Sequence, residues 1–221
     1  MLFLDMKNNH KKPLGQEELD ALELEGLWKA QSFSRNLARK TNEKITLENI
    51  LKIHFIFFKD AIPDIAGRFR KPGEDIKKLN TIEPVLGSAV QQEMYKFSKE
   101  LNEKISIISL RFPQKKYEKE KWFQEVLDLA AWIQYKITAI HPFVNGNGRM
   151  ARMMTNVILC RFGLFQSNIH YEGVDKKKYI QALSNIDLGD NYELLKVLIA
   201  RSMQDTYKKA YEAFQNQKRK K

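Results

Sequence analysis

The sequence is poor in cysteine and histidine, which excludes two kinds of site. Among 221 residues there is one cysteine, Cys160, and there are four histidines. A single cysteine cannot form an internal disulfide, which suits a reducing compartment. The histidines and the cysteine do not cluster with the spacing of a zinc site. We therefore expect a cytoplasmic protein without a structural disulfide or zinc centre.

Long hydrophobic runs are also missing. The densest run, 53–58, ends at Lys59 and falls well short of the ~20 apolar residues of a membrane helix. The first residues, "MLFLDMKNNHKK", contain too short an apolar run for a signal peptide and no small-residue cleavage site. Apolar residues still make up 43% of the chain, a normal globular fraction. We expect a chain that folds around a core and does not enter a membrane.

Acidic residues are outnumbered, with 27 Asp and Glu against 38 Lys and Arg, for a net charge of +11. A basic surface favours anionic partners such as nucleotides, nucleic acid or a membrane surface. Part of the excess lies near the ends, in 7–12 and 218–221. No nucleic-acid motif accompanies the charge, so nucleic acid is not the expected partner.

Apolar residues recur at helical spacing along most of the chain. About seven helices are predicted, in segments 16–38, 45–60, 88–105, 121–140, 149–163, 175–187 and 191–215. Thr46 and Asp175 are the expected N-caps of two of them. Gly26 is a candidate break in the first, and Pro63 is expected to end the second.

The intervening segment 66–87 contains three glycines and two prolines, which favours a loop with a short β-hairpin. The predicted fold is therefore one mainly α domain over 1–221, with its core at about 16–200. We expect a polar N-terminal segment at 1–15 and a basic tail at 216–221.

One stretch, "HPFVNGNGRMAR" from His141 to Arg152, combines groups that suit a phosphate site. Alternating Asn and Gly tolerate positive φ, so successive N–H groups can form an anion nest. The following helix adds its unpaired N–H groups and the positive end of its dipole. Arg149 and Arg152 lie on one helical face, where guanidinium groups suit bidentate phosphate binding. So many donors indicate a diphosphate or triphosphate ligand.

Each of these features also has an ordinary structural explanation. A histidine after an apolar helix is commonly a core residue, and Asn-Gly loops before helices are common. Arg149 and Arg152 alone could form surface ion pairs worth less than ~1 kcal/mol. The ordered combination favours a nucleotide site, and His141 is its one obvious proton acceptor. The site is not a Walker loop, because no Lys-Ser/Thr follows the glycines.

The stretch resembles the Fic family motif H-P-F-x-(D/E)-G-N-(G/K)-R-x-x-R and departs from it at one fixed position, Asn145. The segments "AGRFR" and "YIQALSNIDLGDN" are also similar to Fic proteins, and the likeness spans about 16–200. Within the family, the chain resembles short bacterial members with "NGNGR" and an N-terminal "LEG". The resemblance implies a Fic-type helical domain.

The resemblance further implies a protein adenylyltransferase, which moves AMP from ATP, with Mg²⁺, to a Tyr, Thr or Ser hydroxyl. His141 would be the general base, and Phe143 would anchor the loop. The implied nucleotide-binding residues are Asn145, Gly146, Asn147, Gly148, Arg149 and Arg152. The implied flap, which would align the target as an added strand, contains Asp75, Ile76, Lys77, Lys78 and Leu79.

Asn145 leaves the chemistry open, because the family places Asp or Glu there as a Mg²⁺ ligand. A neutral amide oxygen is a weaker ligand, although phosphates can supply others. Transfer of another nucleotide or of phosphate, and removal of AMP, therefore stay as alternatives. A non-catalytic protein that binds nucleotide or nucleic acid is another alternative, but simple phosphate binding would not need His141.

The family also implies self-inhibition through a motif (S/T)-x-x-x-E-(G/N), in which the Glu pairs with the second motif arginine. Here Glu25 and Gly26 match, and Ala21 stands in place of the hydroxyl residue. The expected contact is therefore between Glu25 and Arg152, and the other reading of Glu25 is a solvated helix residue. Self-modification and a homo-oligomer are both compatible with the sequence.

Overall fold

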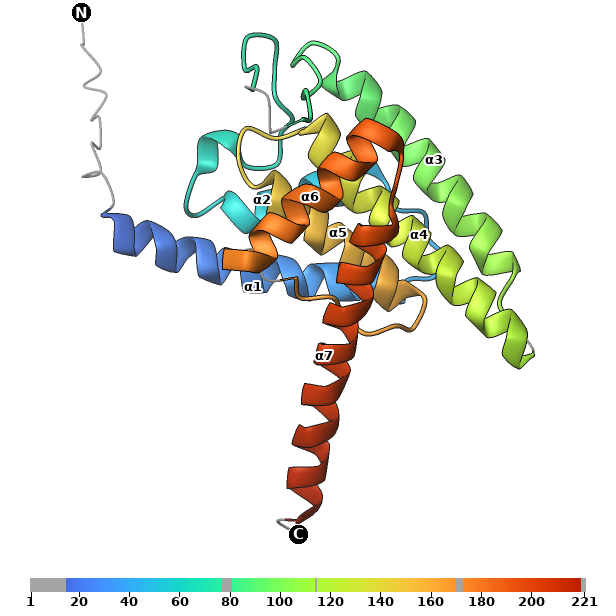
Figure 1. The fold of residues 1–221 in the computed structure, drawn as a ribbon. Helices are drawn as coiled ribbons and strands as arrows, with labels where there is room; N and C mark the ends of the chain where they lie inside the picture. Colours follow the sequence, from blue (N-terminus) through green and yellow to red (C-terminus); the bar gives the residue numbers. More distant parts are fainter. Residues whose placement is uncertain (1–14, 77–80, 114, 170–172, 220–221) are drawn as a thin grey trace, which may run out of the picture.

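The computed structural model describes residues 15–76, 81–113, 115–169 and 173–219. These residues form seven α-helices and one short 3-10 helix, which confirms the predicted number of helices (Figure 1). In chain order the elements are α1 (Gln16–Arg39), α2 (Leu47–Phe58), η1 (Pro63–Ile65), α3 (Val90–Leu110), α4 (Lys116–Ile140), α5 (Asn147–Arg161), α6 (Gly173–Gly189) and α7 (Glu193–Arg219).

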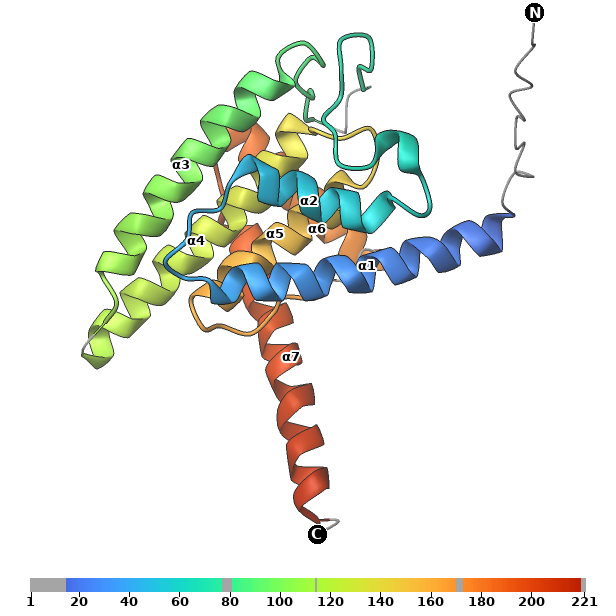
Figure 2. The ribbon, with the colours of Figure 1, turned by 180° about the vertical axis from the view of Figure 1, so that it is seen from behind.

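Helix α5 lies at the centre of the fold. Ten of its residues are buried, and it packs against α1 and α4. The two opposite views place α2 on one side of α5 and α6 on the other (Figures 1 and 2). Its first turn follows the motif loop directly, so the apolar contacts that bury α5 also fix the loop.

Helix α1 is not broken at Gly26, the candidate break in the sequence. The helix runs without interruption from Gln16 to Arg39, and Gly26 is buried. A Cβ atom at this position would lie 2.1 Å from the carbonyl oxygen of Phe57. Gly26 therefore allows α1 and α2 to approach backbone to backbone, and this packing offsets the ~1 kcal/mol that glycine costs in a helix.

Other helix ends confirm or correct the predictions. Thr46 is the N-cap of α2 and accepts a hydrogen bond from the backbone N–H of Asn49. Helix α2 ends at Phe58, so Pro63 does not terminate it and instead begins η1. Helix α6 begins at Gly173, which places Asp175 in the first turn and not at the cap. Residues 216–219, expected in the tail, continue α7.

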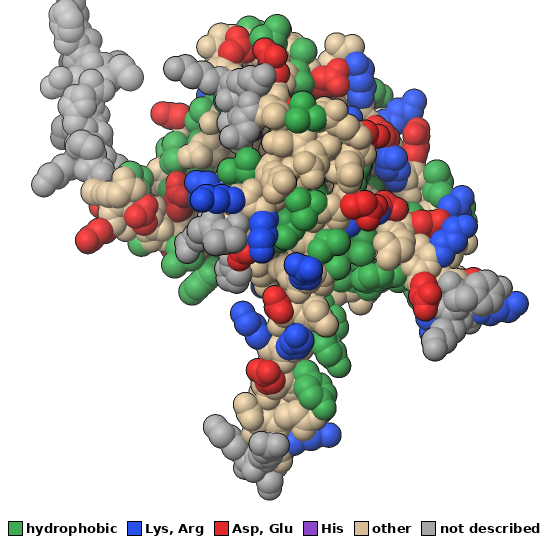
Figure 3. Space-filling model, viewed as in Figure 1, with side chains coloured by type: hydrophobic (Ala, Val, Ile, Leu, Met, Phe, Trp, Pro, Cys, Tyr) green, Lys and Arg blue, Asp and Glu red, His purple; other side chains and the backbone are tan. Residues whose placement is uncertain are grey.

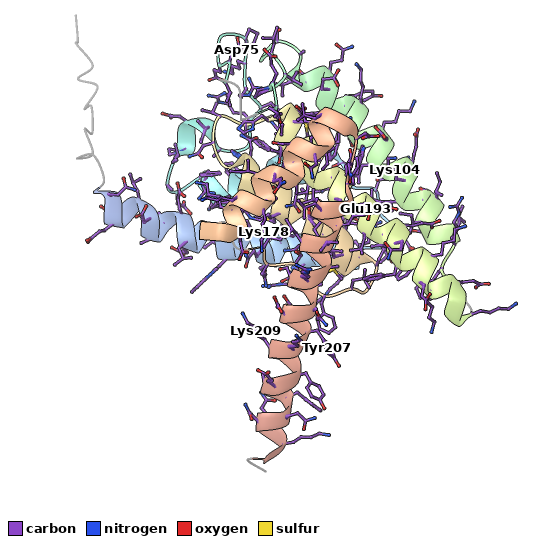
Figure 4. All side chains as sticks on the ribbon, viewed as in Figure 1. Asp75, Lys104, Lys178, Glu193, Tyr207 and Lys209 are labelled. Atoms are coloured by element: carbon purple, nitrogen blue, oxygen red, sulfur yellow. The ribbon has the colours of Figure 1, made fainter. Side chains whose placement is uncertain are left out.

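The segment between η1 and α3 is held beside the motif loop by Arg70. Its side chain is completely buried, and its Nε donates to the carbonyl of His141 at 2.7 Å. The Arg70 backbone N–H also donates to the carbonyl of Pro142 at 2.8 Å. Asp75, labelled in Figure 4, accepts a hydrogen bond from the N–H of Gly87 at 2.7 Å. These contacts fix both ends of the segment.

The expected β-hairpin is not formed by the described parts of this segment, residues 66–76 and 81–87. The predicted flap residues Lys77, Lys78 and Leu79 lie outside the described residues, while Asp75 and Ile76 lie within them.

The C-terminal half of α7 projects from the body of the fold (Figures 1 and 2). Tyr207 and Lys209 mark this projecting part in Figure 4. On the face shown in Figure 3, basic and acidic side chains are intermixed, with both signs of charge on the projecting α7. Within the described ranges, no helix has both the length and the apolar character that a membrane crossing requires.

Candidate active site

The motif loop connects α4 to α5 through two residues in the left-handed region. His141 caps α4 with φ 51° and ψ 58°, and Gly146 caps the start of α5 with φ 83°. A non-glycine residue at positive φ is uncommon and is often found at functional sites. At Gly146 a Cβ atom would lie 2.5 Å from the Phe58 ring. Position 146 therefore requires glycine for two reasons, its backbone angle and its close approach to Phe58.

The His141 imidazole is arranged as a proton acceptor. Its Nδ1 lies 3.2 Å from the carbonyl oxygen of Thr138, which can only accept, so Nδ1 carries the proton in the neutral ring. Nε2 is then left with a lone pair. Burial lowers the pKa of His141, the hydrogen bond to Thr138 raises it, and the charge of Arg70 lowers it again, with a net decrease. The ring is therefore neutral at neutral pH.

The start of α5 offers backbone donors to an anion. The N–H groups of Asn147, Gly148 and Arg149 belong to the first turn and have no acceptor within the helix. The N–H of Gly146 donates to Oδ1 of Asn145 at 2.7 Å, so a side-chain oxygen already occupies one of the loop donors. Phosphate oxygens match such donors, and the helix dipole adds to the attraction.

Asn147 contributes to the loop in a way that the motif alone does not reveal. Its side chain is 3% exposed and forms two hydrogen bonds with the backbone of Phe143. The Phe143 N–H donates to Oδ1 at 2.9 Å, and Nδ2 donates to the Phe143 carbonyl at 2.7 Å. Both ends of the amide bond within the loop, so the backbone N–H is the group of Asn147 that is placed to meet a phosphate.

The two motif arginines have different surroundings. The Arg149 guanidinium lies over the rings of Phe57 and Phe58, 4.6 and 5.1 Å from their centroids, and forms an ion pair with Glu23 of α1. Arg152 lies one turn further along α5, and its Nη1 is 3.4 Å from the position that a Cβ on Gly148 would take. Both arginines can face one ligand from the same end of the helix.

These groups open into one cavity of about 560 Å³. Its wall combines the motif loop with α6, the end of α4 and the segment before α3. The lining residues are Ile82, Thr138, His141, Val144, Asn145, Gly146, Asn147, Gly148, Arg149, Arg152, Tyr179, Ile180, Leu183 and Ser184. The volume suits a nucleotide-sized ligand, and α6 supplies the apolar wall opposite the donors.

The predicted inhibitory residue Glu25 lies elsewhere. Its side chain is 59% exposed and pairs with Lys29 at 2.8 Å. The carboxylate of α1 that reaches the motif belongs to Glu23, which is 24% exposed and paired with Arg149. Residues two positions apart point to opposite sides of a helix, so the two glutamates cannot share one orientation. The expected contact of Glu25 with Arg152 is thus replaced by a contact of Glu23 with Arg149.

Three contributors to the site were missed by sequence analysis: Glu23, Tyr179 and His54. Tyr179 lies on α6 and is 3% exposed at the cavity wall. His54 lies on α2, completely buried, and its Nε2 is 3.1 Å from the carbonyl oxygen of Asn145. Burial lowers the pKa of His54 to about 4, so the ring is neutral. The one signal in the sequence was a titratable residue within the apolar run 53–58.

A family model and individual relatives of this chain point to the same family. The model of the Fic/DOC family matches residues 44–159, which include α2 to most of α5. The protein adenylyltransferase Fic of Nematostella vectensis is 27% identical over 176 residues, covering 80% of this chain and 36% of that protein. The protein adenylyltransferase fic-1 of Caenorhabditis elegans is 25% identical over 155 residues, covering 70% of this chain and 27% of that protein.

Solved structures share the fold. Residues 134–508 of Fic-1 from C. elegans align with a TM-score of 0.70 at 23% identity, covering 94% of this chain and 56% of that one. A Fic domain containing signalling protein from Bacteroides thetaiotaomicron gives 0.64 at 19%, covering 88% and 74%. BepC from Bartonella tribocorum, solved with bound AMPPNP, gives 0.53 at 18%, covering 85% and 86%.

Proposed function

The chain belongs to the Fic/DOC family, and from this premise we propose that it transfers AMP from ATP to a Tyr, Thr or Ser hydroxyl of a protein. The observation that carries the proposal is the common cavity of His141 and the donor-rich start of α5. A base beside an anion site is what nucleotidyl transfer to a hydroxyl needs. The named adenylyltransferases among the relatives support the choice of AMP.

In this reaction Nε2 of His141 takes the proton of the target hydroxyl. The hydroxyl oxygen forms a bond to the α-phosphorus of ATP, and the bond between that phosphorus and the bridging oxygen to the β-phosphate breaks. Pyrophosphate leaves with the electron pair of the broken bond. The hydrogen bond from Nδ1 to Thr138 fixes the tautomer and the ring orientation, so Nε2 is the atom presented to the hydroxyl.

The chain stabilises phosphate charge with groups that are already in position. The first-turn N–H groups of Asn147, Gly148 and Arg149 face the loop side of α5, with Gly146 before them. Arg149 and Arg152 add two guanidinium groups at the same helix end. Donors held by the fold require little reorganisation when charge moves toward the leaving pyrophosphate, which is the main source of their benefit.

Mg²⁺ fits this site through a single protein ligand. Oδ1 of Asn145 is an oxygen of the kind that Mg²⁺ accepts, and the cavity lining given above includes no carboxylate. Asn145 would therefore hold the ion together with phosphate oxygens, and the ion would supply charge neutralisation on the phosphates. Oδ1 accepts one hydrogen bond, from the N–H of Gly146, and its second lone pair is available to the ion.

We also propose that Glu23 inhibits the enzyme by pairing with Arg149. The ion pair with Glu23 joins α1 to α5 across 126 positions of sequence and uses Arg149, a phosphate ligand. An anion that binds Arg149 must compete with this carboxylate, and the negative charge of Glu23 repels phosphate. The exposed pair between Glu25 and Lys29 imposes no such competition.

In this proposal the target protein binds beside the segment before α3. Ile82 lines the cavity, and Asp75 and Arg70 hold the two ends of the segment. This arrangement supports a flap that includes Asp75 and Ile76; positions 77–79 of the predicted flap lie outside the described residues. The chain spans 36% and 27% of the length of the N. vectensis and C. elegans relatives. We therefore propose, and do not carry over from them, a protein target, self-modification and a homo-oligomer.

The test is intact mass spectrometry of this protein and of lysate proteins after incubation with Mg²⁺ and each nucleoside triphosphate. An AMP adduct with ATP, absent in His141→Ala, is the expected result. A phosphate adduct would favour phosphate transfer, and loss of AMP from a pre-modified protein would favour the reverse reaction. Binding of nucleotide without any adduct on any protein would contradict the proposal.

A further inference from the structure

His54 connects two segments that flank the cavity, although it does not line the cavity. Its ring is completely buried and lies between two backbone groups. The N–H of Gly67 donates to Nδ1 at 3.0 Å, and Nε2 lies 3.1 Å from the carbonyl oxygen of Asn145. Gly67 belongs to the segment after η1, and Asn145 belongs to the motif loop. One side chain of α2 therefore joins both.

The geometry leaves one protonation state for the His54 ring. A backbone N–H can only donate, so Nδ1 must accept from Gly67 and carry no proton. A backbone carbonyl can only accept, so Nε2 must carry the proton and donate to Asn145. The ring is stacked on Phe143, with centroids 3.9 Å apart and planes 4° from parallel, and the Phe143 backbone is in turn held by Asn147. The ring cannot rotate without disturbing the loop.

The bond to Asn145 also sets the direction of a phosphate donor. In a trans peptide the carbonyl and the following N–H point in opposite directions. Because His54 holds the Asn145 carbonyl toward the core, the N–H of Gly146 points away from the core. Its present acceptor is Oδ1 of Asn145, a residue that lines the cavity. The same peptide leads into the first turn of α5, with its further donors.

We propose that His54 is a positioning residue, which fixes the Asn145–Gly146 peptide so that the N–H groups at the start of α5 face the phosphates of the bound nucleotide. This inference rests on the proposed nucleotide transfer for its kinetic consequence. Its structural core, the orientation of one peptide, does not depend on that function. A residue that merely filled the core would need neither nitrogen.

Two substitutions separate the two hydrogen bonds. The amide of Gln reaches the position of Nε2, so His54→Gln can keep the donor to Asn145 and loses the acceptor for Gly67. The amide of Asn reaches the position of Nδ1, so His54→Asn keeps the acceptor for Gly67 and loses the donor to Asn145. Ile50→Ala is the matched control, because Ile50 is also completely buried on α2, and its side chain has no polar atom that could hold either segment.

The first readout is amide hydrogen exchange of each folded variant, which needs no enzymatic activity. We expect a crossed pattern: exchange at Gly146 accelerates in His54→Asn, and exchange at Gly67 accelerates in His54→Gln. The Ile50→Ala control should speed exchange without this distinction. Equal exchange at both glycines in the two His54 variants would overturn the inference.

The second readout is steady-state transfer, with the dissociation constant of a non-hydrolysable ATP analogue. His54→Asn should lower kcat/KM about tenfold, the effect of one hydrogen bond, while His54→Gln should stay within about threefold of wild type. A similar tenfold loss in Ile50→Ala would also overturn the inference. If wild type transfers nothing, the proposed function fails, and the exchange pattern alone decides the role of His54.

Discussion

The motif loop and helix α1 face each other across Arg149, but they are held in place by different forces. The loop is fixed by buried hydrogen bonds within itself, chiefly the two between Asn147 and Phe143. Helix α1 reaches the site through one partly exposed ion pair, from Glu23. Buried hydrogen bonds are costly to break because both partners lose their compensation, whereas an ion pair in contact with water exchanges readily. The loop is therefore the fixed side of the site and α1 the adjustable side.

The largest effect should come from the base on the fixed side. His141→Ala removes the only side chain in the cavity lining that is arranged to accept the hydroxyl proton, while leaving the phosphate donors in place. We expect transfer to fall by about 10²–10⁴-fold and the affinity for an ATP analogue to change little. Adduct formation followed by mass spectrometry and calorimetric binding measure the two quantities. Near-normal transfer by this variant would contradict the assigned base.

The pH dependence of transfer tests the same residue without a substitution. His141 must be neutral to accept a proton, and burial lowers its pKa. Activity should therefore be lost as pH falls, with a midpoint below about 6.5, the ordinary histidine value, and about tenfold per pH unit further down. Rates of adduct formation across a pH series provide the measurement. A midpoint at or above the ordinary value would contradict the buried, neutral ring.

Gly146→Ala should disrupt the packing of the motif loop. The new Cβ would meet the Phe58 ring at 2.5 Å in a residue with φ 83°. We expect a loss of about 2–4 kcal/mol in the free energy of unfolding and weaker binding of ATP. Gly189→Ala is the control, since it adds the same methyl group where nothing lies within 4 Å. Equal denaturation midpoints for the two variants would contradict the packing described for the loop.

Glu23→Gln should remove the ion pair that joins α1 to Arg149. Neutralising Glu23 frees Arg149 for phosphate, so ATP affinity and transfer should rise by about fivefold, the equivalent of roughly 1 kcal/mol. Glu25→Gln is the matched control two residues along the same helix, and it should leave both quantities unchanged. If Glu25→Gln activates and Glu23→Gln does not, the helical phase of α1 in solution differs from the one described.

The smallest effect is expected at Asn145, where the sequence departs from the family motif. Asn145→Asp adds a charged oxygen to the one side chain suited to Mg²⁺ and should lower the Mg²⁺ concentration required for half-maximal transfer. Because phosphates supply other ligands, the maximal rate should change little. A Mg²⁺ titration gives the answer, and an increased requirement would argue against a metal-facing Asn145.

Several details of the site depended on packing that the sequence does not display. The apolar spacing of 16–38 predicts the helix. Whether Gly26 interrupts it cannot be predicted locally, because the glycine is needed for the close approach of the α2 backbone at Phe57. The family motif predicted a contact of Glu25 with Arg152, whereas in the structure it is Glu23 of α1 that pairs with Arg149 of α5. His54 looked like one polar residue in an apolar run, and only the folded chain shows what its two nitrogens contact.

By itself the sequence determined the helical class and the position of the motif loop between two helices. It also determined which residues of that loop are candidates for the site: His141, Gly146 and the two arginines. These features are local, because backbone freedom, helix dipole and side-chain chemistry depend on neighbours within a few residues. Only the tertiary structure decided which carboxylate meets Arg149 and which peptide His54 orients. Those outcomes depend on angles and separations of a few ångströms between segments that are 91 to 126 positions apart, His54 with Asn145 and Glu23 with Arg149.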